Sequence, residues 1–119
     1  MRRVAGWLSL LGAVLALALT GAPVAITVRL SARYAHEPAE IRAEVRIQLH
    51  ADNRAACLTL EGPYSDEGCW DLAGVEAPPL FSRAWRNLPA GEYRSRARLH
   101  RVDASVRFSN LVNLTVIGG

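Results

Sequence analysis

Apolar and polar residues alternate in short runs from residue 26 to the end of the chain. The clearest runs are residues 26–34 and 41–49, where every second residue is apolar and the others are Thr, Arg, Ser, Glu or Gln. Strict alternation over nine residues predicts β-strands, and the polar second face favours an antiparallel sheet. The predicted inward residues of these two runs are Ile26, Val28, Leu30, Ala32, Tyr34, Ile41, Ala43, Val45, Ile47 and Leu49.

Further short runs follow, separated by turns rich in Gly, Pro, Asp and Asn. They occupy residues 55–62, 69–72, 80–88, 89–101 and 106–119, and none of them has the period of a helix. About seven short strands with turns every 8–12 residues predict an all-β antiparallel sandwich. The later inward positions include Trp70, Leu72, Trp85, Tyr93, Ser95, Ala97, Leu99, Phe108, Val112, Leu114 and Val116.

The first 25 residues have a different character. Arg2 and Arg3 precede a Leu- and Ala-rich stretch, and no charged residue occurs between Val4 and Val28. This pattern is typical of a secretory signal helix, so we expect residues 1–25 to be a signal peptide and residues 26–119 the folded domain. The uncharged stretch is also long enough for an uncleaved membrane anchor. Either outcome places the domain outside the cytoplasm, in the periplasm or at the cell surface.

The net charge of the predicted domain limits the classes of partner that we expect. The whole chain has a formal charge of +3, but Arg2 and Arg3 supply two of these charges. The predicted domain is therefore nearly neutral, whereas nucleic-acid binding requires a concentrated basic surface. We expect no nucleic acid partner, and contact with a membrane only through an uncleaved N-terminal segment.

A short motif carries a family resemblance. In "NLPAGEYRSRARL", Leu88 precedes a Pro/Gly turn, and Tyr93 follows Gly91 into an alternating strand. The arrangement resembles the corner between two strands of immunoglobulin-like and fibronectin type III domains, especially small exported bacterial domains of unknown function. The resemblance implies that the Tyr93 hydroxyl bonds to nearby backbone and stabilises the corner. It implies a fold and no reaction.

Cys57 and Cys69 flank a loop, and both fall on outward positions of successive strands. Outside the cytoplasm two cysteines in a small domain usually pair, and cross-strand neighbours come close enough to do so. A zinc site would need nearby histidines, and a redox pair would have closer spacing. We therefore expect a structural disulfide, with metal and redox roles as the alternatives.

Four residues are candidates for binding. Arg94, Arg96 and Arg98 should form a row on a wet sheet face, and Tyr64 should lie exposed at the tip of the loop between the cysteines. The row could bind an anionic glycan, or its arginines could pair with acids such as Glu61 on the next strand. The acidic segment 65–71 matches no known calcium loop, so a solvated turn is the simpler interpretation.

The sequence offers no arrangement of nucleophile, base and orienting group, so we expect no enzymatic activity, cofactor or metal. The primary hypothesis is an exported module that binds a protein partner through a sheet edge or face. The alternative is carbohydrate or polyanion binding through Tyr64 and the face formed by Arg94, Arg96 and Arg98.

Overall fold

The alternating runs form strands in the computed structural model, which describes residues 24–118. In order along the chain, the elements are β1 (Ile26–Leu30), β2 (Tyr34–His36), β3 (Ala39–Ile47), β4 (Asn53–Glu61), β5 (Asp66–Asp71), the 3₁₀ turn η1 (Gly74–Glu76), β6 (Leu80–Leu88), β7 (Gly91–Arg101), β8 (Val106–Phe108) and β9 (Val112–Ile117). The described part of the chain is therefore all-β, as predicted.

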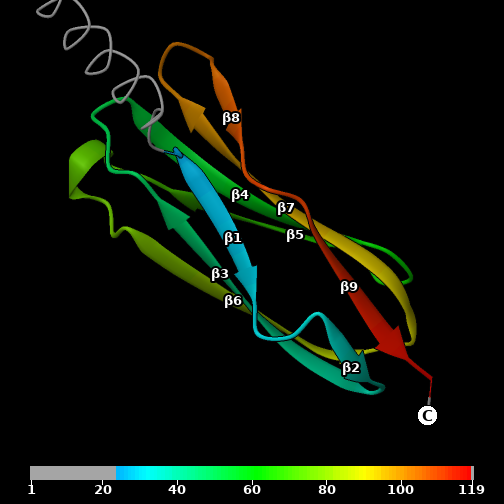
Figure 1. The fold of residues 1–119 in the computed structure, drawn as a ribbon. Coiled ribbons are helices and arrows are strands. Elements are labelled where there is room, and N and C mark those ends of the chain that lie inside the picture. Colours follow the sequence, from blue (N-terminus) through cyan, green and yellow to red (C-terminus); the bar gives the residue numbers. More distant parts are fainter. Residues whose placement is uncertain (1–23, 119) are drawn as a thin grey trace, which may run out of the picture.

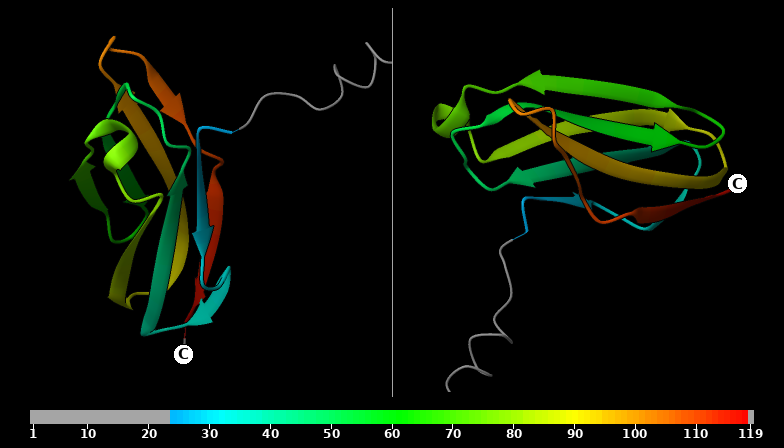
Figure 2. Two further views of the ribbon diagram at one scale, coloured as in Figure 1. Left: turned by 90° about the vertical axis from the view of Figure 1, so that its left-hand side faces the viewer. Right: turned by 90° about the horizontal axis from the view of Figure 1, so that it is seen from above.

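The strands form two sheets that pack as a sandwich (Figures 1 and 2). The smaller sheet has the order β1-β3-β6, and the larger has the order β2-β9-β7-β4-β5 with β8 also paired to β7. All pairings are antiparallel except β2 with β9. The long β7 lies in the middle of the larger sheet, so its outward side chains have neighbours on both sides.

The core lies between the two sheets and consists of the inward positions of the alternating strands. On β3, Ile41, Ala43 and Val45 are at most 1% exposed. Tyr93 and Leu99 of β7 are buried against them from the other sheet. Alternation therefore identified the core correctly where a strand stays in one sheet over its whole length.

The first predicted strand changes sheet instead of continuing. It ends at Leu30, and the chain then crosses to the larger sheet, where β2 pairs with β9. Tyr34 was predicted to point inward with Ile26, but it is 74% exposed because the crossing reverses its face.

The last predicted strand is also interrupted. Residues 109–111 separate β8 from β9, and the side chain of Asn110 turns toward β1. Its Oδ1 accepts a hydrogen bond from the Val28 amide, and its Nδ2 donates one to the Val28 carbonyl, both at 3.0 Å. Phe108 was predicted to point inward, but it lies opposite Arg98 on the outer face of the sheet and is 57% exposed.

One smaller prediction needs correction, and another is confirmed in part. Leu49 lies beyond the end of β3 and is exposed rather than buried. Trp70 does face the interior, but β5 is an edge strand, so the indole is only partly covered and packs against Phe81.

The predicted signal peptide or anchor lies outside the described residues, apart from Val24 and Ala25. Within residues 24–118 no helix is long and apolar enough to cross a membrane.

Candidate functional site on the outer face of the larger sheet

The predicted arginine row lies on the outer face of the larger sheet. Arg94, Arg96 and Arg98 alternate along β7 with Tyr93, Ser95, Ala97 and Leu99, all of which are at most 1% exposed. The outward residues of β4 lie beside them, because Cys57 is in register with Arg98, Thr59 with Arg96 and Glu61 with Arg94. The row therefore crosses a patterned surface formed by β4, β5, β7 and β8.

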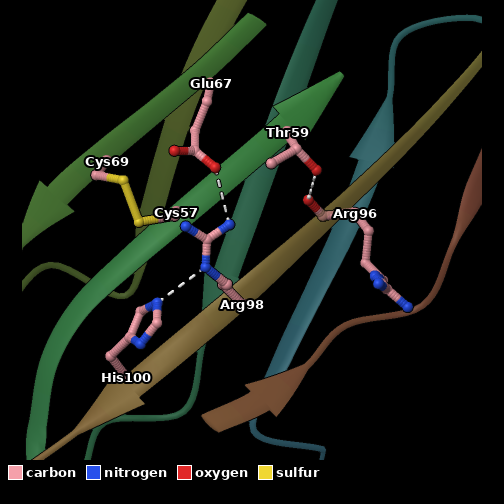
Figure 3. Close-up of a disulfide and its surroundings, with 7 residues drawn as sticks. All are labelled: Cys57, Thr59, Glu67, Cys69, Arg96, Arg98 and His100. Carbon is pink, nitrogen blue, oxygen red and sulfur yellow. Dashed lines mark hydrogen bonds and ion pairs between the residues drawn. A yellow bond between two sulfur atoms is a disulfide. The ribbon is translucent and has the colours of Figure 1, made fainter. Parts of the chain in front are cut away.

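The predicted disulfide is confirmed. Cys57 of β4 and Cys69 of β5 are direct cross-strand neighbours, with their Cα atoms 4.1 Å apart. Cys57 is only 5% exposed although it faces outward, whereas Cys69 is exposed. Within residues 24–118 no cysteine is free. The bond joins the edge strand to the sheet beside the arginine row (Figure 3).

Arg98 is held by two partners next to the disulfide. Its Nη1 donates to the Glu67 carboxylate at 2.9 Å, and its Nε donates to His100 Nε2, also at 2.9 Å. Figure 3 shows the side chain stretched between these two groups. A guanidinium that is held from both ends is less available to an external anion.

The other two arginines are also occupied. Arg94 forms an ion pair with Glu61 at 3.5 Å, the partner that the sequence had indicated. The Arg96 guanidinium carbon lies 4.6 Å from the centroid of the Phe108 ring, a distance typical of a cation–π contact. The row is therefore a set of individually paired cations.

The outer face of the larger sheet has a small excess of negative charge. Three arginines, Arg94, Arg96 and Arg98, share the face with four carboxylates. These are Glu61, Glu67, Asp71 and Glu92. A polyanion would have to displace ion pairs that already exist, which lowers the affinity it can gain.

The same face also has exposed apolar residues. Phe108 and Leu111 are 57% and 50% exposed. Two shallow hollows adjoin them, one of about 130 Å³ with Leu111 in its wall and one of about 120 Å³ with Phe108 in its wall. Thr59, Glu61 and Arg96 contribute to both hollows. Sequence reasoning missed Phe108 because it assumed one continuous strand, and missed Leu111 because residues 109–111 break the alternation.

The corner residues lie where the motif placed them. Leu88 is fully buried, and the Tyr93 hydroxyl donates a 2.7 Å hydrogen bond to the Pro89 carbonyl oxygen. Burial raises the pKa of the Tyr93 phenol, so it remains a donor. Gly91 has a φ of 147°, and a Cβ there would collide with the Pro63 ring. The corner positions β7, and with it the arginine row.

Tyr64 is exposed, as expected, at 46%. It lies in the turn between β4 and β5 but lines neither of the two hollows. Tyr34 and Phe108 are more exposed, and only Phe108 contacts the arginine row. The structure therefore does not bring Tyr64 and the arginines together into one surface.

Most of the acidic segment after Tyr64 is the strand β5 rather than a solvated turn. Asp66 accepts hydrogen bonds from Arg83 at 2.7 and 3.1 Å and from Trp85 Nε1 at 2.8 Å, and both donors belong to β6 of the other sheet. The hydrogen bond from Arg83 lowers the pKa of the Asp66 carboxyl below its ordinary value. This cluster closes the side of the sandwich between the two edge strands, so its carboxylate has a structural role.

Comparisons with known proteins support the fold but do not assign a function. No family model and no curated protein sequence matches the chain. It is similar to the superoxide reductase (neelaredoxin) from Ignicoccus hospitalis, with a TM-score of 0.57 and 12% identity over 76% of this chain and 80% of that one. The sulfur carrier protein SoxY from Chlorobium limicola f thiosulfatophilum gives 0.55 and 14% over 89% and 94%.

A third similar structure is the soluble domain of PmoD from Methylocystis sp. ATCC 49242, with a TM-score of 0.52 and 9% identity over 76% and 90% of the two chains. These proteins have unrelated names and share a sandwich of immunoglobulin-like type. Likeness at this level of identity shows a common fold and assigns no activity.

Proposed function

We propose that this chain is an exported, non-catalytic binding module of the fibronectin type III-like kind. Its partner is a protein, and the binding surface is the outer face of the larger sheet. One observation supports this proposal. Phe108 and Leu111 are exposed on the same face as arginines whose charges are already paired.

The composition of the face favours a protein partner. Aromatic residues and arginine are enriched at protein interfaces, where a few of them supply most of the binding energy. Arg96 stacked on Phe108 offers such a pair, with small hollows beside it that a partner's side chains could fill. A polyanion would gain less, because Arg94 and Arg98 are already compensated.

Export is supported by two features of the chain. The Cys57–Cys69 disulfide is typical of proteins outside the reducing cytosol. The charged start and the following uncharged stretch are typical of a secretory signal.

The test is affinity capture from a cell-envelope extract with three forms of the protein. We expect the unchanged protein to retain a defined partner at 0.5 M NaCl, and the double variant Phe108→Ser/Leu111→Ser to lose it. The matched control is Val75→Ser/Val102→Ser, which removes two equally exposed apolar side chains at the end of the sandwich. Equal loss in both double variants, or release of the partner by salt, would contradict the proposal.

A further inference from the structure

The outer face of the smaller sheet has a net positive charge, whereas the face that contains the predicted arginine row does not. Four arginines and two glutamates point outward from β1, β3 and β6, which leaves an excess of two positive charges. These residues are Arg29, Arg42, Arg46, Arg86, Glu40 and Glu44. The two outer faces of one nearly neutral domain therefore differ in sign.

Three of these arginines are unpaired. Arg86 lies 3.9 Å from Glu40, but the guanidinium groups of Arg29, Arg42 and Arg46 make no ion pair or hydrogen bond with any other residue in 24–118. On the opposite face, each arginine of the row has a carboxylate or an aromatic ring as its partner. Arg29, Arg42 and Arg46 therefore have free hydrogen-bond donors for an external anion.

The three side chains form an elongated group. Arg42 and Arg46 are four residues apart on β3, so their Cα atoms are about 13 Å apart along the strand. Arg29 lies on the neighbouring strand directly opposite Glu44, which is midway between them. A single small anion could not contact all three at once, whereas a chain with several negative groups could.

Two hollows extend this group across the sheet. One of about 300 Å³ is lined by Arg29, Leu30, Ser31, Arg42 and Glu44. The other, of about 190 Å³, lies on the β6 side and is lined by Arg42, Ser82, Arg83 and Ala84. Arg42 belongs to both, and the hydroxyl-bearing residues Ser31 and Ser82 lie in opposite hollows. Arg42 therefore has a hollow on each side of it, one toward β1 and one toward β6.

The surface also differs from an interface for protein or lipid. Of the exposed large hydrophobic residues between 24 and 118, only Leu80 belongs to a strand of this sheet, and it lies at the end of β6. An apolar anchor is therefore missing from the centre of the face, which disfavours a protein hot spot or insertion into a bilayer. Among residues 24–118, the strands of this sheet also present no exposed aromatic ring for stacking neutral sugars.

We propose that Arg29, Arg42 and Arg46 form a binding surface for an acidic polysaccharide. The carboxylate or sulfate groups of the polymer pair with the three guanidinium groups, and its hydroxyl groups bond with the serines of the two hollows. Glu44 opposes this binding and limits its strength. The surface is separate from the protein-binding face, so either proposal can fail without the other.

The experiment measures binding to polygalacturonate and to heparin, with neutral dextran as the blank, using the protein recovered from the envelope. The decisive comparison is between Arg29→Gln/Arg42→Gln/Arg46→Gln and Arg94→Gln/Arg96→Gln/Arg98→Gln. Both variants remove three positive charges, so net charge is the same in each. We expect binding on the order of 10-fold weaker in the first, and a change of less than about 2-fold in the second. Glu44→Gln should strengthen binding about 2-fold.

Several results would overturn the proposal. Equal weakening in the two triple variants would show that net charge alone governs retention, and absence of binding by the unchanged protein would remove the surface altogether. Tighter binding to phosphatidylglycerol vesicles or polyglutamate, with the same dependence on Arg29, Arg42 and Arg46, would assign it to lipid or acidic protein. If the first triple variant does not fold, Arg42→Gln replaces it with an expected loss of about 3-fold, and Arg96→Gln serves as its control.

Discussion

Asp66 connects the two sheets, and its replacement by alanine tests whether this contact stabilises the open side of the sandwich. The substitution removes the acceptor for Arg83 and for Trp85 Nε1. Trp85 is 3% exposed, so its indole N–H would lose its partner without gaining water, at a cost of about 1–3 kcal/mol. The Arg83 side chain is 37% exposed and can turn to solvent, so we discount its share.

We therefore expect Asp66→Ala to lower the free energy of unfolding at pH 7 by about 2 kcal/mol. For a domain of this size the loss corresponds to a decrease of about 10 °C in Tm. Urea denaturation and calorimetry measure it directly. The control is Glu67→Ala at the next position, where the ion pair to Arg98 is more exposed and should contribute about 0.5 kcal/mol.

The pH dependence separates the charge of Asp66 from its packing. The folded-state pKa of the carboxyl is lowered from its ordinary value of 3.8, mainly by the hydrogen bond from Arg83. The charge therefore stabilises the fold above the unfolded-state pKa, and this contribution is lost as the pH falls through the lower folded-state pKa. The difference between wild type and Asp66→Asn should shrink below pH 4. An Asp66→Ala variant within 0.5 kcal/mol of wild type, or a wild type–Asp66→Asn difference that stays constant down to pH 2.5, would refute the reasoning.

Three further predictions concern the disulfide and the corner. Replacing Cys57 and Cys69 by alanine should lower the free energy of unfolding by about 3 kcal/mol in a denaturant titration, because the bond closes a short loop; a loss below 1 kcal/mol would contradict this. Tyr93→Phe should cost about 1 kcal/mol through its single hydrogen bond, and an unchanged Tm would show that the bond contributes nothing. Gly91→Ala should cost at least 1–2 kcal/mol because of its φ of 147°. Gly118→Ala is the matched control, expected within 0.5 kcal/mol, and equal effects at the two glycines would remove the steric argument.

Hydrophobic periodicity predicted the fold well where one strand belongs to one sheet. The alternation in 41–47 and in 93–99 gave the correct inward residues. It failed at Tyr34 and Phe108, because the chain changes sheet before Tyr34 and the strand breaks after Phe108, while the apolar residues on the two sides of each break keep the same parity. Such a change depends on tertiary contacts, such as the pairing of β2 with β9, which no local pattern contains.

The pairing of charges on the candidate surfaces could also be predicted only in part from the sequence. The sequence placed Arg94, Arg96 and Arg98 on one face and named Glu61 as a partner, and both statements agree with the structure. Compensation by Glu67 depends on the register of β5, and the ring under Arg96 depends on where β8 pairs with β7. The alternation of 26–34 and 41–49 also contained the unpaired arginines of the smaller sheet. Only the arrangement in space showed that their charges are not neutralised.

The side chain of Asn110 has a consequence for the free edge of β1. Its amide occupies both backbone groups of Val28, the middle residue of a strand that otherwise pairs only with β3. Both bonds go to main-chain atoms, so they do not depend on which side chain stands at position 28. By occupying the backbone groups of an edge strand, Asn110 denies a second chain the place where pairing would begin.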